Sequence, residues 1–200
     1  MELTTEEKII AAARKLFTQK GFSATRTRDI AEEAGINLAL LNYYFRSKEK
    51  LFIIIMTETL SSFLQHLTII LNDMNTGLEK KIELIASNYI DFLLGEPELP
   101  LFLMSELRNN AGDFIEKLAL QDIFVNSEFF KQYSRAVEAG EVTEPNAFQM
   151  LLNILGFVVF PFIAQPMIAV TGKIDNKHFV QMMRERKRRV PVWVKAILKA

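Results

Sequence analysis

The chain has 200 residues, half of them hydrophobic, and no cysteine. A chain of this length and composition buries a full core without disulfides or metals. The lack of cysteine excludes thiol catalysis, disulfides and cysteine-based zinc sites, and it fits a reducing compartment. Residues 1–8 are polar and contain no apolar signal core, so we expect a cytoplasmic protein.

The formal net charge of zero conceals three segments of different sign. Residues 1–50 hold 9 Lys and Arg against 7 Asp and Glu, residues 51–172 hold 6 against 15, and residues 173–200 hold 9 against 2. A phosphate backbone meets only the surface that faces it, and an acidic segment repels it. We therefore expect any contact with DNA to lie at one end of the chain.

The predicted elements are all helices. Glycine is scarce, no Asn-Gly or Asp-Gly hairpin signal occurs, and no run alternates with period two. Thr4 and Glu7 have the spacing of a capping box, and Lys20-Gly21 is typical of a helix C-terminus. Ser47 is positioned to cap a long fourth helix. The first four predicted helices span about 5–20, 27–34, 36–45 and 48–71.

The remaining chain predicts five further helices, which gives about nine in an all-α fold. Gly140 is expected to end a long helix, and Asp175 is expected to cap the last one. Pro161 and Pro166 are expected to interrupt the apolar helix that begins near Pro145, and Pro191 is expected to kink or reset the last helix. The predicted spans are about 78–94, 99–108, 114–139, 146–172 and 176–200.

Residues 25–45 carry the most informative pattern. Two short predicted helices joined by a turn with glycine match a helix-turn-helix, whose second helix enters the major groove of DNA. Gly35 suits the left-handed conformation that ends the first helix, and Ala31 is small where the helices approach. The apolar inner face consists of Ile30, Ala34, Ile36, Leu41 and Phe45.

The outer face of the second helix has the side chains that DNA recognition requires. With Leu41 pointing inward, a rotation of about 100° per residue places Leu38, Ala39, Asn42 and Tyr43 outside. Asn bonds adenine edges, and Ala or Leu contacts thymine methyl groups. Donors suited to phosphate surround this face. The predicted DNA-binding residues are Thr27, Arg28, Asn37, Leu38, Ala39, Asn42, Tyr43, Tyr44 and Lys48.

The chain from Glu6 to about Phe52 resembles the TetR/AcrR family of bacterial helix-turn-helix regulators. The resemblance is carried in order and spacing by Ile10-Ala11-Ala12, Leu16-Phe17, Gly21-Phe22, Asp29-Ile30-Ala31, Ala34-Gly35-Ile36 and Tyr44-Phe45-Arg46-Ser47-Lys48-Glu49. It implies a DNA-binding domain over residues 5–64, with the motif at about 28–47. It also implies a C-terminal bundle over residues 65–200 that binds a small molecule and forms a homodimer through its last helices.

The resemblance places further side chains by position only. Six residues would line an effector pocket, namely Tyr89, Phe92, Phe102, Glu106, Phe124 and Phe129. Four would form the dimer interface, namely Phe157, Val158, Val159 and Phe162. The helix that begins after Ser47 would link the DNA-binding domain to the pocket, because its two ends lie in the two domains.

Two other segments allow a different interpretation. The basic run 184–189 suggests nucleic-acid binding, but on a helix its charges spread around the surface, and they can instead pair with the acidic middle of the chain. The apolar stretch 154–164 is eleven residues long, whereas a membrane span needs about twenty. We expect a buried helix there and no membrane association.

The sequence therefore predicts a cytoplasmic transcriptional regulator that is not an enzyme and needs no cofactor or metal. Its expected partners are double-stranded operator DNA, a second copy of the chain and an unknown small-molecule effector. Effector binding would favour a state that does not fit the operator and so release the DNA. Two alternatives stay open on the same scaffold: a protein that coats DNA without sequence preference, and an interaction protein that binds no DNA.

Overall fold

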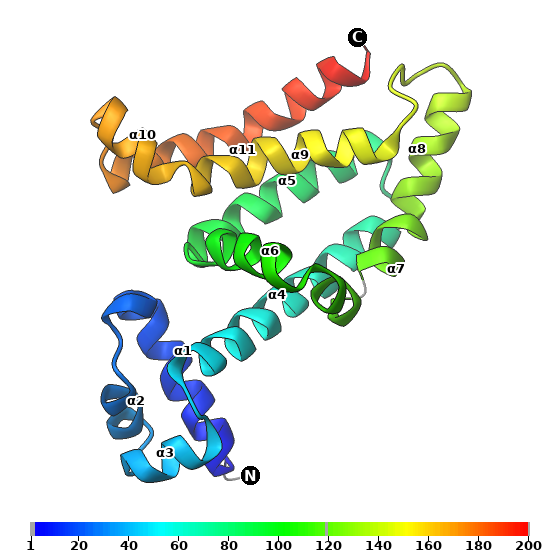
Figure 1. The fold of residues 1–200 in the computed structure, drawn as a ribbon. Coiled ribbons are helices and arrows are strands. Elements are labelled where there is room, and N and C mark those ends of the chain that lie inside the picture. The colour runs from blue at the N-terminus through cyan, green and yellow to red at the C-terminus, as the bar shows by residue number, and fades with distance from the viewer. Residues whose placement is uncertain (1–2, 119, 200) are drawn as a thin grey trace. The chain divides into compact units, whose positions relative to one another are not determined.

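The computed structural model describes residues 3–118 and 120–199, and over these residues the chain forms eleven α-helices and no strand. The all-α prediction is confirmed. The chain divides into two compact units, Met1–Ser62 and Phe63–Ala200. Figure 1 shows the order of the helices along the chain.

The N-terminal unit contains α1 (Thr5–Ala24), α2 (Thr27–Glu33), α3 (Leu38–Tyr44) and the first part of α4 (Lys48–Asn72). Thr4 and Glu7 form the predicted capping box, in which each side chain accepts a hydrogen bond from the backbone of the other residue. Gly21, with φ 77°, interrupts α1 one turn before its end, whereas the sequence predicts that the helix ends at this glycine. The core of the unit includes Ile9, Ala13, Leu16, Phe17, Ile30, Leu41, Leu51 and Ile55.

The C-terminal unit is arranged around α5 (Leu78–Gly95). One face of α5 is buried at the spacing of an amphipathic helix, because Ile82, Ala86, Ile90 and Leu93 recur every three or four residues. Helices α8, α9 and α11 pack against α5. The other helices of the unit are α6 (Leu99–Lys117), α7 (Leu120–Val125), α8 (Glu128–Glu138), α9 (Ala147–Ile163), α10 (Gln165–Gly172) and α11 (Asn176–Leu198).

The single helix predicted over 114–139 is wrong. Helix α6 continues to Lys117, and α7 and α8 follow as separate helices, so the described chain has eleven helices and not about nine. Ser127 explains the second break, because its hydroxyl donates to the carbonyl of Phe124 at 2.7 Å and accepts from the amide of Phe130 at 3.3 Å. One serine thus serves the end of α7 and the start of α8, a signal that apolar periodicity does not contain.

The prolines disrupt the helices less than the sequence predicts. Pro161 lies inside α9 and Pro191 inside α11, and both helices continue past them. The break comes at Ala164, where α9 and α10 meet at 62°, and Pro166 stands in the first turn of α10. A proline in a first turn costs no hydrogen bond, since the amide there has no helical acceptor.

Helix α4 is the one described helix that is long and apolar enough to cross a membrane by length and composition. Helices α9 and α10 meet the same criterion only when the bent pair is counted as one span. The apolar character of α4 has a structural use, because its buried side chains belong to the cores of both units. These include Leu51 and Ile55 in the first unit and Leu64, Leu67 and Leu71 in the second.

Candidate nucleic-acid interface

The turn between α2 and α3 has the geometry that the motif requires. Gly35 adopts φ 68°, the amide of Gly35 donates to Glu32 at 3.0 Å, and the amide of Ile36 donates to Ala31 at 3.0 Å. This pair of bonds is the Schellman arrangement that ends a helix sharply. This turn lets both helices bury an apolar side chain in the core, since Ile30 of α2 and Leu41 of α3 are 0% and 1% exposed.

Helix α3 consequently presents its outer face to solvent. Ala39, Asn42 and Tyr43 lie at positions i, i+3 and i+4, so they share one face, and all three are exposed. Tyr43 is 81% exposed, which is unusual for so large an apolar ring. Its ring makes an edge contact with Tyr44, with centroids 5.5 Å apart. This face combines an amide, a methyl group and aromatic surface, the chemistry that base edges and sugars contact.

Four other predicted DNA-binding residues, in α2 and at the start of α3, differ in their exposure and in their hydrogen bonds. Arg28 in the first turn of α2 is exposed, and Thr27 beside it is half-buried. Asn37 caps α3, because its side-chain oxygen accepts from the amide of Leu40 at 2.8 Å. Leu38 is half-buried. Asn37 therefore has a structural role in holding the first turn of α3.

Lys48 does not extend into solvent as a phosphate donor would. Its ammonium group donates to the carbonyl of Phe22 at 2.8 Å and to that of Thr25 at 2.9 Å, and it lies 4.1 Å from the centroid of the Phe22 ring. An ammonium group has three N–H donors, and two of them are used here. Lys48 thus connects the start of α4 to the carbonyl groups at the end of α1, where a cation also suits the helix dipole.

Sequence reasoning missed the cluster that surrounds Lys48. Thr25 is buried, and its hydroxyl donates to the carbonyl of Gly21 at 2.8 Å. The rings of Phe17, Phe22 and Phe52 pack on one another at centroid distances of 4.5–5.8 Å. The three rings come from α1 and α4, which are distant in sequence, so no local pattern predicts their contact. They fix the frame to which α2 and α3 are attached.

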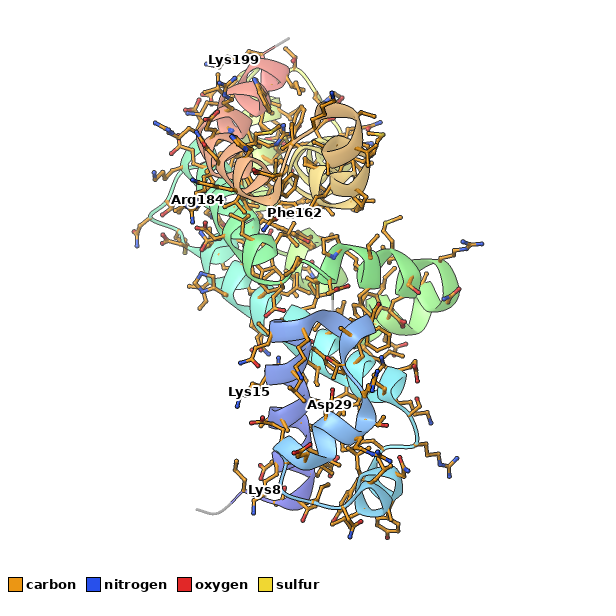
Figure 2. All side chains as sticks on the ribbon, turned by 90° about the vertical axis from the view of Figure 1, so that its left-hand side faces the viewer. Lys8, Lys15, Asp29, Phe162, Arg184 and Lys199 are labelled. Atoms are coloured by element: carbon orange, nitrogen blue, oxygen red, sulfur yellow. The ribbon has the colours of Figure 1, made fainter. Side chains whose placement is uncertain are left out.

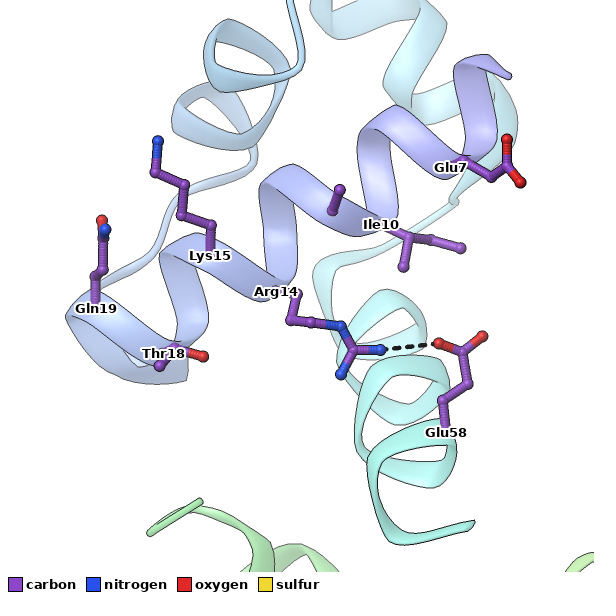
Figure 3. Close-up of a pocket in the computed structure, with 8 residues that line it drawn as sticks. Glu7, Ile10, Arg14, Lys15, Thr18, Gln19 and Glu58 are labelled. Atoms are coloured by element: carbon purple, nitrogen blue, oxygen red, sulfur yellow. Dashed lines mark hydrogen bonds and ion pairs between the residues drawn. The ribbon is translucent and has the colours of Figure 1, made fainter. Parts of the chain in front are cut away.

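A shallow hollow of about 600 Å³ lies on the side of α1 that faces α4 (Figure 3). In it Arg14 pairs with Glu58 at 3.0 Å and bonds the hydroxyl of Thr59 at 2.5 Å. None of the predicted DNA-binding residues lines this hollow. Its polar groups stabilise the packing of α1 on α4, and we do not assign it to DNA.

Three of the six predicted effector residues make ring contacts with other aromatic side chains. Tyr89 and Phe92 pack on Phe63, with centroids 4.8 and 3.9 Å from it, whereas Phe102 contacts Phe114 at 5.9 Å. Tyr89, Phe102 and Phe129 are buried, and Phe92, Glu106 and Phe124 are half-buried. The hollow of about 1010 Å³ between the start of α5, α8 and the end of α11 is lined by none of the six.

Two of the four predicted dimer residues are buried within the single chain. Val158 and Phe162 are 1% and 6% exposed within the single chain, because this side of α9 packs on the rest of its own unit. Phe157 packs on Trp193, with centroids 5.6 Å apart, and Val159 is half-buried. The exposed apolar side chains of α9 are instead Phe148, Leu152 and Phe160, which are 52–61% exposed. Because one face of α9 is buried within its own unit, only the opposite face is accessible to a second copy of the chain.

Several charges of the basic run bond within the chain. Lys187 pairs with Asp91 at 2.6 Å, and Lys195, a little further along α11, pairs with Glu79 at 3.0 Å and Glu83 at 3.3 Å. The pairing of the basic last helix with the acidic middle segment is therefore observed inside one subunit. Arg184 and Lys199 are exposed on α11 and directly after it (Figure 2).

Comparison with known proteins identifies the N-terminal unit. Residues 9–54 match the family model described as bacterial regulatory proteins, tetR family. The "Probable HTH-type transcriptional regulator YttP" of Bacillus subtilis (strain 168) is 36% identical over 88 residues, which are 44% of this chain and 35% of that protein. The fatty acid metabolism regulator protein of the same organism is 24% identical over 144 residues, 68% of this chain and 70% of that protein. The chain thus spans about a third of the first relative.

Solved structures extend the likeness in fold to nearly the whole chain. A TetR/AcrR transcriptional regulator from Thermobifida fusca has a TM-score of 0.67 at 18% identity and covers 93% of this chain and 96% of its own. The Bacillus subtilis regulator FadR in complex with stearoyl-CoA has a TM-score of 0.55 at 18% identity and covers 92% and 96%. The helix-turn-helix and the exposed face of α3 agree with the match of residues 9–54 to the tetR family model, and the solved TetR/AcrR structure shares the fold of nearly the whole chain.

Proposed function

We propose that this chain is a sequence-specific, operator-binding repressor that acts in the cytoplasm as a homodimer. The observation that carries the proposal is the outer face of α3, where Ala39, Asn42 and Tyr43 are exposed while Leu41 on the opposite face is 1% exposed. Two recognition helices in a dimer would read the two halves of a near-palindromic operator. Repression is the expected mode because an occupied operator excludes the polymerase.

The experiment that tests this proposal is a titration of the purified chain against a labelled fragment from upstream of its own gene, with scrambled competitor DNA at physiological salt. We expect tight binding that resists the competitor and has dimer stoichiometry. If genome-wide selection of bound fragments also yields no preferred sequence, operator binding is refuted. Affinity that is insensitive to sequence would instead indicate a DNA-coating protein.

A small apolar or amphipathic effector is proposed to release the operator. Tyr89 supports this part, because the residue is 6% exposed and its ring packs on Phe63 among apolar side chains of the C-terminal unit. Burial raises the pKa of the Tyr89 phenol to about 12, so at neutral pH it remains a hydrogen-bond donor. Apolar effector pockets use a few polar groups of this kind to orient a ligand, and a ligand oxygen or nitrogen would accept a hydrogen bond from the phenol.

Stearoyl-CoA is the first effector to test, because a structural relative is solved in complex with it. We expect it to release the chain from its operator by favouring the state that does not bind DNA. Tyr89→Phe, which removes only the hydroxyl, should weaken this response and leave operator affinity without effector unchanged. If stearoyl-CoA has no effect while operator binding is intact, an acyl-CoA effector is refuted and the DNA-binding function stands.

The homodimer is proposed to form through the exposed side of α9. Phe148, Leu152 and Phe160 present apolar side chains along this side, and exposed groups of this size mark interaction surfaces. Exposed Met167 and Val170 extend the apolar surface into α10. A second copy of the chain has the same surface, so a two-fold contact would bury both at once.

A further inference from the structure

A proline in α9 leaves one main-chain carbonyl without its helical donor. In an α-helix each carbonyl accepts from the amide four residues later, and for Phe157 that residue is Pro161, which has no N–H. A side chain of α11 takes the vacant position. Arg186 donates to the carbonyl of Phe157 from Nε at 3.2 Å and from Nη2 at 2.8 Å.

The same guanidinium is held from its other side. Its Cζ lies 5.0 Å from the centroid of the Trp193 ring, and the Trp193 and Phe157 rings are 5.6 Å apart. Arg186 and Trp193 are seven residues apart in α11, so two helical turns place them on one face. All three side chains are half-buried. The arginine is thus enclosed between a carbonyl of α9 and a ring of its own helix.

We propose that Arg186 is a positioning residue that replaces the hydrogen bond removed by Pro161 and thereby fixes α9 against α11. Its place in the basic run 184–189 suggests an anion-binding role, but two of its donors point at a carbonyl group. Arg188, two residues along the same helix, is exposed and provides a matched control. The role concerns the internal order of the C-terminal unit and does not depend on an effector or an operator.

If the proposal is correct, Arg186 contributes to stability because Pro161 leaves the Phe157 carbonyl without a donor. A double-mutant cycle at the two positions tests this dependence in the full chain. Arg186→Met should raise the unfolding equilibrium constant about ten- to a hundredfold, because it removes hydrogen bonds from a charged donor and leaves the carbonyl unpaired. Pro161→Ala restores a backbone N–H for the Phe157 carbonyl. In that background Arg186→Met should raise the constant less than about threefold, since the carbonyl keeps a partner.

The readouts are denaturant unfolding and the emission of Trp193, the single tryptophan of the chain. Arg186→Met should alter the emission because the cation leaves the ring, and Arg188→Met should change neither readout. If Arg186→Met yields no folded protein, Arg186→Lys takes its place in the same cycle. Lysine keeps the positive charge but has fewer N–H donors. Equal losses of stability with and without the Pro161→Ala substitution would overturn the proposal, as would an unchanged Trp193 emission.

Discussion

Substitution of Lys48 by methionine distinguishes a phosphate contact from a structural one. Sequence position alone assigns Lys48 to the DNA backbone, whereas in the structure its ammonium bonds the carbonyls of Phe22 and Thr25. Methionine keeps the length and apolar stem of the side chain and removes the charge with its donors. The structural role predicts a less stable N-terminal unit, and the phosphate role predicts a change in the salt dependence of binding.

The expected loss of stability is about 2–4 kcal/mol. Hydrogen bonds from a charged donor contribute about 1.5–3 kcal/mol each, but the loss at Phe22 is smaller because its carbonyl also accepts from the amide of Thr25 at 3.3 Å. The cation over the Phe22 ring adds about 0.5–1 kcal/mol at a partly exposed site. Unfolding in denaturant, followed by circular dichroism, measures the total. Lys50→Met, an exposed lysine of the same helix, should leave stability unchanged.

Operator affinity measured from about 50 to 200 mM salt decides between the two roles. For Lys48→Met we expect weaker binding with an unchanged slope of log affinity against log salt, since this lysine does not neutralise a phosphate. Arg28→Ala, at an exposed position, should flatten the slope by about 0.9 for each phosphate that the arginine neutralises. If Lys48→Met flattens the slope equally and retains full stability, the lysine binds phosphate and its structural assignment is refuted.

Three further substitutions test the other assignments. Asn42→Ala should cost about 1–3 kcal/mol in operator binding and leave binding to scrambled DNA unchanged in the same titration; equal losses on both would refute a base contact. Leu152→Glu should yield a folded monomer in analytical ultracentrifugation, whereas buried Val158→Ala should lower stability and keep the dimer; a dimeric Leu152→Glu variant places the interface elsewhere. Lys81→Met should cost about 1–3 kcal/mol in denaturant unfolding, because the buried ammonium donates to the Leu71 carbonyl at 2.7 Å; unchanged stability would contradict this.

The N-terminal unit was predictable because its signals are local. A capping box needs two residues three apart, and the turn at Gly35 needs one residue that tolerates positive φ. The outer face of α3 then follows from helical rotation once Leu41 is known to point inward. The cluster around Lys48 was not predictable, because Phe22 and Thr25 are more than twenty residues away in sequence. Lys48 also bonds their main-chain carbonyl groups, which every residue has, so the side-chain types at these positions give no signal.

The C-terminal unit shows why apolar periodicity alone misassigns contacts. In α9 nearly every residue from Ile154 to Ile163 is apolar, so the sequence does not distinguish the side that faces the core from the side that faces solvent. The tertiary partners decide it, and they bury Val158 and expose Phe160. Break points between helices are equally hidden, because at Ser127 one hydroxyl group divides a pattern that is otherwise typical of a continuous helix.

Part of the opposite charge of the middle and last segments is paired by the same tertiary contacts. Lys187 with Asp91, and Lys195 with Glu79 and Glu83, place cations of α11 against carboxylates of α5. Exposed pairs of this kind contribute little stability each, but they cancel charge that would otherwise repel. Lys187 and Lys195 are therefore engaged within the chain and do not offer their charge to DNA. The residues of α2 and α3 remain the surface on which the DNA-binding proposal depends.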